Sequence, residues 1–264
     1  MTSPTFELAA HSWVLLLLAA MLVGISKTAL PGINTISIAI FAAVLPAKAS
    51  TGALLLLLMV GDVFALVSYR RHADWRALLK LIPFAALGLG FGALFLALAH
   101  DGSVRRVIGA ILLVLIGVTL WQNWRRRSGA GGATVQDPST AAAASPAQFA
   151  ARAGFGTLGG FTTMVANAGG PVMSLYFLSA RLPVKTFLGT AAWFFAAINL
   201  TKLPISIGLG LITPETLELD MLLVHGVVAG AVLGRWVASR IRQQTFEWAV
   251  IVGTALGALY LLIA

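Results

Sequence analysis

The chain has 264 residues, of which 59% are hydrophobic and only 10% are charged. Soluble domains carry about 25% charged residues, so this composition excludes an ordinary soluble protein and favours an integral membrane protein. The absence of cysteine excludes disulfides, thiolate metal sites and cysteine nucleophiles. The net charge of +9 does not indicate nucleic-acid binding, because the lysines and arginines flank apolar segments.

The first half of the chain contains five apolar segments, at residues 6–26, 35–45, 48–69, 76–99 and 104–124. The first is not expected to be a secretory signal peptide, because Glu7 but no Lys or Arg lies at its start and no small-residue cleavage site follows. After it, the sequence Lys27-Thr-Ala-Leu-Pro-Gly-Ile-Asn34 interrupts the apolar run with helix-breaking and hydrogen-bonding residues. We call residues 27–34 the first break.

Residues 125–148 follow, rich in Gly, Ala, Ser, Thr and Pro without apolar periodicity, and this composition predicts a flexible connector. The second half again contains five apolar segments, at residues 149–166, 171–181, 184–209, 217–240 and 246–263. The sequence Asn167-Ala-Gly-Gly-Pro171 interrupts it in the equivalent place. We call residues 167–171 the second break.

Two segments, 35–45 and 171–181, are too short to cross a bilayer. About 11 residues of α-helix extend about 16 Å, roughly half of the hydrocarbon thickness. Each short segment directly follows a break. Because unwound backbone survives in lipid only where protein or a water-filled cavity satisfies it, paired breaks of this kind indicate the substrate site of a secondary transporter.

The two halves also resemble each other in sequence. A shift of 137 residues superposes Ser37 on Ser174, Pro46 on Pro183, Lys48 on Lys185, Gly52 on Gly189 and Asp62 on Asn199. A shift of 142 residues then aligns Gly88-x-x-x-Gly92 with Gly230-x-x-x-Gly234, which we interpret as helix-packing motifs. The repetition favours a carrier built by duplication.

We therefore predict an all-α integral membrane protein with about ten helical segments in two inverted five-segment repeats. The repeats are residues 1–124 and 149–264, and residues 125–148 connect them. An odd number of crossings in each half gives the repeats opposite orientations. Segments at each break either cross fully or return as re-entrant hairpins, and the sequence leaves both open.

Orientation follows from the positions of the basic residues. With Lys27 counted on one face and Lys202 on the other, one face receives fourteen Lys and Arg and the other receives four. The positive-inside rule makes the first face cytoplasmic. The connector is then cytoplasmic and both termini lie outside, together with the acidic residues Glu215, Glu218 and Asp220.

The chain resembles the sulfite exporter TauE/SafE family, also called the 4-toluene sulfonate uptake permeases. The resemblance rests on the duplicated plan and on the Gly-rich sequences that include or adjoin the two breaks, at residues 24–32 and 166–171. It also rests on the Leu-Pro-x-Lys turns at residues 45–48 and 182–185. The first break departs from the Gly-Gly-Gly run of the family, with Pro31-Gly32-Ile33 in its place. Membership implies export or uptake of small sulfur-containing anions such as sulfite and organosulfonates across a bacterial inner membrane.

The residue chemistry independently favours an anion. A helix that starts inside the membrane presents unpaired N–H groups and the positive end of its dipole to an oxyanion. Asn34 or Thr35 is expected to cap segment 35–45, and Pro171 suits the first turn of segment 171–181. The predicted substrate-binding residues are Lys27, Thr28, Gly32, Asn34, Thr35, Asn167, Gly169, Gly170 and Ser174.

Three titratable residues are candidates for coupling or ion pairing: Asp62, Lys202 and His225. Asp62 is the only carboxylate expected well inside a span, and it either binds a coupling proton or pairs with Lys27. Lys27 and Lys202 either contact substrate or extend to the membrane surface, and His225 either carries protons or packs between helices.

An enzyme is disfavoured, because the four histidines are scattered and no Gly-x-Ser-x-Gly motif occurs. We expect no cofactor or metal. An anion channel remains an alternative to a carrier, since a pore would also use Gly-rich breaks. The expected partners are a small anion, the lipid bilayer and a coupling proton or ion, with the oligomeric state left open.

Overall fold

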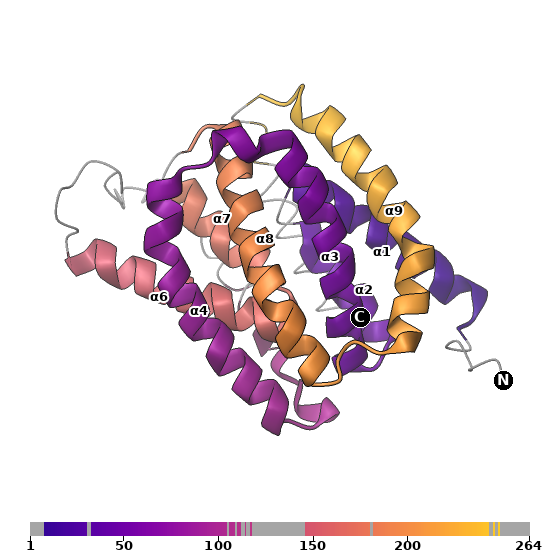
Figure 1. Ribbon diagram of the computed structural model, residues 1–264. Helices are drawn as coiled ribbons and strands as arrows, with labels where there is room; N and C mark the ends of the chain where they lie inside the picture. The colour runs from indigo at the N-terminus through magenta and orange to yellow at the C-terminus, as the bar shows by residue number, and fades with distance from the viewer. Residues whose placement is uncertain are drawn as a thin grey trace.

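The computed structural model describes residues 8–30, 33–104, 106–108, 110–111, 114, 117, 146–179, 182–242, 245 and 248. These residues form helices and turns, with no strand among them (Figure 1). The helices are α1 (Ala10–Thr28), α2 (Asn34–Val44), α3 (Ala47–Tyr69), the 3-10 helix η2 (Arg70–His72), α4 (Trp75–Leu98), α6 (Pro146–Ala166), α7 (Gly169–Ser179), α8 (Val184–Gly208) and α9 (Pro214–Ala238). The all-α prediction is confirmed.

The α-helices agree with eight of the predicted segments to within a few residues. The predicted segments at 104–124 and 246–263 lie mostly outside the described residues, as do Gly32 and most of the connector. Helix α6 begins at Pro146, inside the range assigned to the connector. Both short helices, α2 and α7, have 11 residues, as expected.

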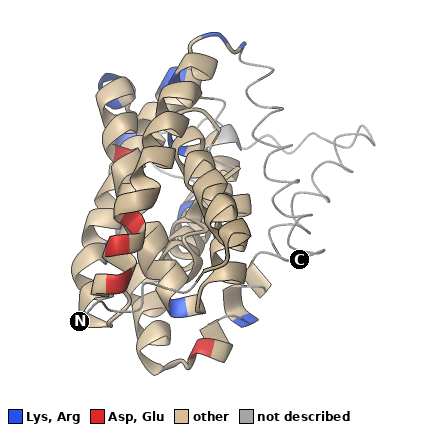
Figure 2. Cartoon of the chain, turned by 90° about the vertical axis from the view of Figure 1, so that its right-hand side faces the viewer, with Lys and Arg blue, Asp and Glu red and all other residues tan. Residues whose placement is uncertain are grey.

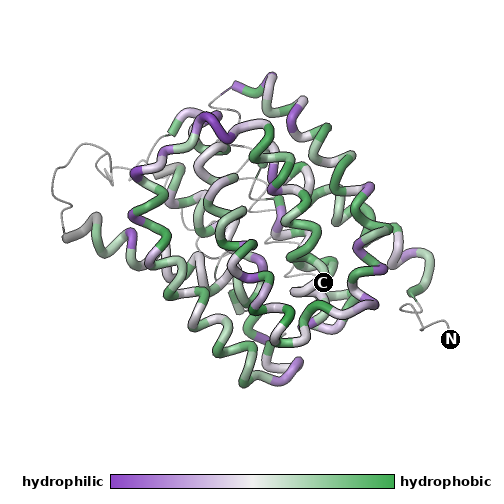
Figure 3. The backbone as a smooth tube through the Cα atoms, in the orientation of Figure 1, coloured by the Kyte–Doolittle hydropathy of each residue, from purple (hydrophilic) through white to green (hydrophobic). Residues whose placement is uncertain are grey.

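In the described part of the chain, five helices are long and apolar enough to span a membrane: α1, α3 with η2, α4, α8 and α9. Large apolar side chains such as Val14, Val67, Leu79 and Val232 are exposed on their outer faces. Apolar residues occur along the whole length of these helices (Figure 3). The chain is therefore a multi-pass membrane protein whose exposed apolar surface faces lipid.

Helices α3 and α8 lie side by side in the centre, with α1 and α9 on one side and α4 and α6 on the other (Figure 1). The short helices complete the interior: α2 packs against α1 and α3, and α7 packs against α6 and α8. Helices α2 and α7 also contact each other. The two breaks, which precede these short helices, are thereby brought together.

The pairs α1–α9 and α4–α6 approach closely at glycines. A Cβ at these positions would collide with a backbone carbonyl of the neighbouring helix: Gly24 with Val227 and Gly230 with Met21 in α1–α9, and Gly160 with Ala85 and Gly88 with Thr157 in α4–α6. The interpretation of the Gly-x-x-x-Gly sequences as packing motifs is confirmed. Both pairs therefore make the same kind of glycine-to-carbonyl contact. Residues with equivalent roles in the two pairs are separated by nearly the same number of positions in the sequence.

Caps explain where several helices begin. Helix α9 starts at Pro214 rather than at residue 217, because Thr213 and Thr216 form a capping box and proline suits the first helical position. Asp74 caps α4 by accepting from the N–H of Ala77 at 3.0 Å. The carboxylate of Asp101 accepts from the N–H of Lys48 at 2.9 Å and so caps α3.

Charge is distributed unevenly between the two ends of the helices (Figure 2). Lysines and arginines gather at the end formed by η2, the starts of α4 and α8, and the end of α9. Asp101 and Glu215 lie at the opposite end, near the starts of α3 and α9.

Candidate functional site

The second break turns the chain between α6 and α7 at Asn167. This residue has φ +53°, in the left-handed region that Asn tolerates better than most residues. Its N–H donates to the carbonyl of Thr163 at 3.1 Å, which completes the end of α6. Its side-chain amide donates to the carbonyl of Thr51 in α3 at 3.0 Å. The break is therefore held rigidly against the first half of the chain.

The first break meets the second through Asn34, whose side-chain amide donates to the carbonyl of Asn167 at 3.3 Å. The prediction that Asn34 or Thr35 caps α2 is wrong. The cap position is Ile33, which makes no side-chain cap bond, and Asn34 is already the first helical residue. The amide of Asn34 reaches across to the other half instead of back to its own helix.

A buried ion pair joins α1 to α3. The ammonium of Lys27 lies 2.6 Å from Oδ1 of Asp62, and it also lies 4.7 Å from the ring centroid of Phe195. The other carboxylate oxygen of Asp62 accepts from the side-chain amide of Asn199 at 2.6 Å. Lys27 therefore does not extend to the membrane surface, and the predicted pairing with Asp62 is confirmed.

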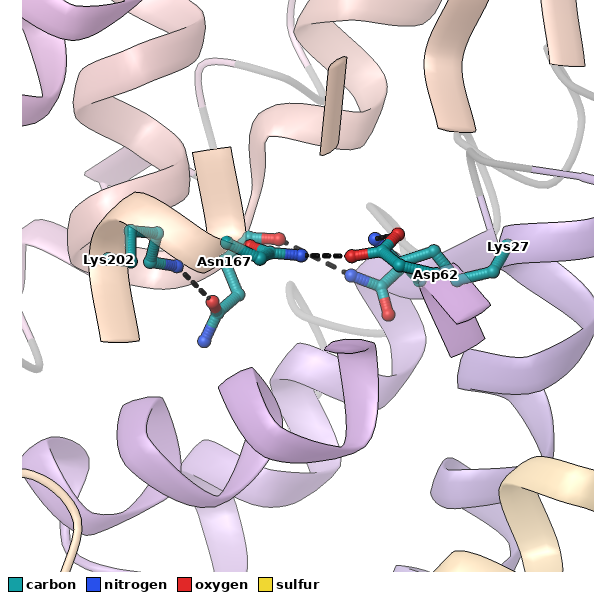
Figure 4. A network of polar contacts seen from close by, with 6 residues as sticks. Lys27, Asp62, Asn167 and Lys202 are labelled. Atoms are coloured by element: carbon teal, nitrogen blue, oxygen red, sulfur yellow. Dashed lines mark hydrogen bonds and ion pairs between the residues drawn. The ribbon is translucent and has the colours of Figure 1, made fainter. Parts of the chain in front are cut away.

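A second lysine is buried on the other side of the same cluster. Lys202 is fully buried and donates to the carbonyl of Thr163 at 2.6 Å and to Oδ1 of Asn167 at 2.5 Å. The alternative that Lys202 extends outward is therefore wrong. Figure 4 shows the two groups of polar contacts, one with Lys27 and Asp62 and the other with Asn167 and Lys202.

Positive charge exceeds negative charge in this cluster, which contains Lys27, Lys202 and Asp62. A buried lysine is expensive unless it is paired and hydrogen-bonded, and ionisable residues inside a membrane are usually functional. The stem of Lys27 needs space as well: a Cβ on Gly61 would lie 2.8 Å from its Cγ. Sequence and packing thus maintain a cationic centre where the two breaks meet.

A small cavity lies at this centre. Its walls come from both halves of the chain and consist of Ser26, Lys27, Asn34, Leu58, Asp62, Thr163, Asn167, Gly170, Ala191, Ala192, Phe195 and Asn199. The space open to the centre of a water molecule is about 20 Å³, just above the roughly 10–15 Å³ that one water requires. In this conformation the cavity is too small for an oxyanion without movement of its walls.

Two wall residues have buried amide oxygens with no hydrogen-bond partner, Oδ1 of Asn34 and Oδ1 of Asn199. Lys27 is the single cation among the described wall residues, and Asp62 is the single carboxylate. No cluster of three or more His, Cys, Asp or Glu that could hold a metal ion occurs in the described part of the chain. The polar chemistry available here is hydrogen bonding and charge.

The structure brings five of the predicted site residues to the cavity wall: Lys27, Asn34, Asn167, Gly170 and Asp62. Lys202 lies directly behind Asn167. Gly169 packs on the side chain of Thr163, where an added Cβ would lie 2.8 Å from the Thr163 Cβ.

Three other predicted residues are placed elsewhere. The hydroxyl of Thr28 donates to the carbonyls of Gly24 and Ala231, so it ties α1 to α9. Thr35 and Ser174 are buried but do not line the cavity. The structure therefore does not place these three hydroxyls on the cavity wall.

His225 is exposed on the outer face of α9, where its ring contacts the carbonyl of Leu222 in the same helix. It is therefore neither near the cavity nor packed between helices. Asp220, which was expected outside the membrane, is only 7% exposed, and neither carboxylate oxygen has a hydrogen-bond partner. Asp220 is therefore a second buried carboxylate beside Asp62, which the sequence did not predict.

Asn199, Thr163 and Phe195 line the cavity but were absent from the predicted site. One sequence signal pointed to Asn199, because the repeat alignment superposes it on Asp62. Thr163 contributes a backbone carbonyl, and no side-chain pattern reveals such a contact.

A sequence model of the sulfite exporter TauE/SafE family matches residues 16–261, which include every residue of the cavity wall. Comparisons with curated proteins and with solved structures found no match.

Proposed function

Because the chain belongs to the sulfite exporter TauE/SafE family of membrane transporters, we propose that it carries small sulfur-containing anions, such as sulfite or organosulfonates, through the central cavity. The observation that carries this proposal is the position of Lys27. Lys27 lines the cavity at the point where the two helix breaks meet. Membership of a transporter family favours anion transport, and so does a buried lysine at paired helix breaks.

The donors around the cavity suit an oxyanion. Gly170, in the first turn of α7, lines the cavity, so the positive end of the α7 dipole and its free N–H groups are near the bound anion. Lys27 supplies a charge-assisted hydrogen bond. Lys202, behind Asn167, adds positive potential. We assign binding to Lys27, Asn34, Asn167, Gly169 and Gly170.

We further propose that residues 1–124 and 149–264 are inverted repeats and that the cavity lies near the midplane between them. The equivalent glycine contacts of α1–α9 and α4–α6 support a two-fold relation. Asp62 and Asn199, equivalent in the sequence alignment, meet at the centre. Rocking of one repeat against the other would then open the cavity to each side in turn.

For orientation, we propose that the basic end is cytoplasmic, that the connector lies on that side, and that both termini face outward from a bacterial inner membrane. Because Lys27 and Lys202 are buried, each membrane face loses one of the cations assigned to it from the sequence. The excess of Lys and Arg on the proposed cytoplasmic face remains. Figure 2 agrees with this asymmetry for the described residues.

Two measurements on the purified protein test the function. A ligand that binds only the folded form raises the melting temperature, so we expect sulfite or a sulfonate to stabilise the protein more than chloride or a carboxylate does. In proteoliposomes, the stabilising anion should be taken up saturably and against its gradient when a driving gradient is supplied. Uptake that does not saturate and never concentrates the anion would favour a channel, and no stabilisation by any sulfur oxyanion would contradict the proposed substrate class.

A further inference from the structure

Asp62 occupies the binding groups that an anion would need. Its two oxygens accept from Lys27 and from Asn199, each at 2.6 Å. Lys27 is thereby neutralised, although it is the cation that lines the cavity in the described part of the chain. An anion that enters this cavity therefore competes with Asp62 for the ammonium of Lys27.

The small volume of the cavity makes this competition direct. The space open to a water centre is about 20 Å³, so an oxyanion and the Asp62 carboxylate are not accommodated side by side on Lys27. If Asp62 left Lys27 while still ionised, two like charges would share a buried, low-dielectric space, and one of them would have no cation. A neutral Asp62 removes that repulsion.

Two cations of the described part of the chain act on the charge of Asp62, Lys27 of α1 and Lys202 of α8. Lys202 is already bonded to Thr163 and Asn167. Of the other elements packed against α3, α2 carries no titratable residue, whereas α9 carries Glu215, Glu218, Asp220, His225 and Arg235, and η2 carries Arg70, Arg71 and His72. The ion pair and hydrogen bonds of Asp62 described above involve none of them.

The cavity also lacks hydrogen-bond donors for two of its acceptors. Oδ1 of Asn34 and Oδ1 of Asn199 are buried without a partner, and both residues line the cavity. A fully ionised oxyanion brings no donor to them, whereas a protonated carboxyl has one O–H to donate. Of these two residues, Asn199 is the one whose side chain is already hydrogen-bonded to Asp62.

We propose that Asp62 is a proton-coupling site: the anion displaces Asp62 from Lys27, and Asp62 takes up one proton from the water on the side of entry. When the anion leaves, the proton returns to water on the side of exit and Asp62 pairs with Lys27 again. One proton then accompanies one anion in the same direction. This inference rests on the proposed function, because it assumes that the anion binds at Lys27.

Calorimetry of sulfite binding in two buffers of different ionisation enthalpy tests the coupling, because it counts protons taken up for each anion bound. Wild-type protein is compared with Asp62→Asn, which keeps the shape of the side chain and matches Asn199. Sulfite can itself bind with or without a proton, so the count that reports Asp62 alone comes from an anion that carries none. Methanesulfonate, the anion of a strong acid, serves as a second probe. Glu218→Gln, which changes an exposed carboxylate on α9, is the control.

We expect wild type and Glu218→Gln to take up about one proton more per anion than Asp62→Asn does. Equal proton counts in wild type and Asp62→Asn, with binding intact, would overturn the coupling role and leave the anion site standing; a swing of ionised Asp62 to Lys202 would give this result. If neither protein bound sulfite or methanesulfonate, the anion site itself would be wrong, and the coupling proposal with it.

Discussion

The side-chain amide of Asn199 donates to Oδ2 of Asp62 at 2.6 Å, and the two residues hold equivalent places in the two halves of the sequence. They come from the central helices α3 and α8. One half thus supplies a carboxylate where the other supplies its neutral isostere. Among the described residues that line the cavity, Asp62 is the single carboxylate.

The second break is expected to limit the size of the anion. Gly170→Val places a branched side chain on the cavity wall, close to the start of α7. We expect it to abolish anion binding while the protein still inserts into membranes, because the long apolar helices are unchanged. Anion affinity and melting temperature of the purified variant check this. Normal binding by a folded Gly170→Val protein would remove the second break from the site.

Helix packing predicts the opposite behaviour for Gly88 in α4. A Cβ there would collide with the carbonyl of Thr157 in α6, whereas a Cβ on Gly90 in the same helix meets nothing within 4 Å. Gly88→Ala should therefore lower the free energy of unfolding by about 1–3 kcal/mol, with little change in anion selectivity. Gly90→Ala should leave it unchanged or raise it by up to about 1 kcal/mol. Equal melting temperatures for the two variants would argue against the close α4–α6 contact.

Much of this fold is evident from the sequence because the membrane imposes simple rules. Apolar length and the two breaks predict the eight described α-helices, including the two short ones, α2 and α7. The ion pair of Lys27 with Asp62 is also predictable, since unpaired charges in lipid are expensive. Hydropathy does not predict which way a side chain points within a helix bundle. The inward direction of Lys202, the outward direction of His225 and the burial of Asp220 therefore emerge only from packing.

Asp220 is expected to reduce stability. Its carboxylate oxygens are buried and unpartnered in α9, and a buried polar group without a partner costs about 1–3 kcal/mol. Asp220→Leu should therefore raise the melting temperature, while Glu218→Leu, on the exposed side of the same helix, should not. A lower melting temperature for Asp220→Leu would indicate that Asp220 has a stabilising partner in the membrane.

The proposed topology predicts where reporter fusions are active. A reporter that works only in the cytoplasm should be active within residues 125–148 and inactive at Ala264. Activity at both positions would contradict opposite orientations of the two repeats, because an odd number of crossings must separate them.

The central claim is that Lys27 binds the anion, and the most direct test compares two variants that both lack the buried carboxylate. Lys27→Gln alone would leave Asp62 buried without its cation, which by itself destabilises a protein by about 3–5 kcal/mol. Asp62→Asn in turn leaves the buried Lys27 without its carboxylate, at a comparable cost in stability, but it keeps the ammonium available to an anion. Lys27→Gln combined with Asp62→Asn then removes only the ammonium. Sulfite affinity should be at least about 10-fold weaker in the double variant, as expected for loss of a charge-assisted hydrogen bond of about 1.5–3 kcal/mol. Equal affinity in the two folded variants would contradict the account and assign Lys27 a purely structural role.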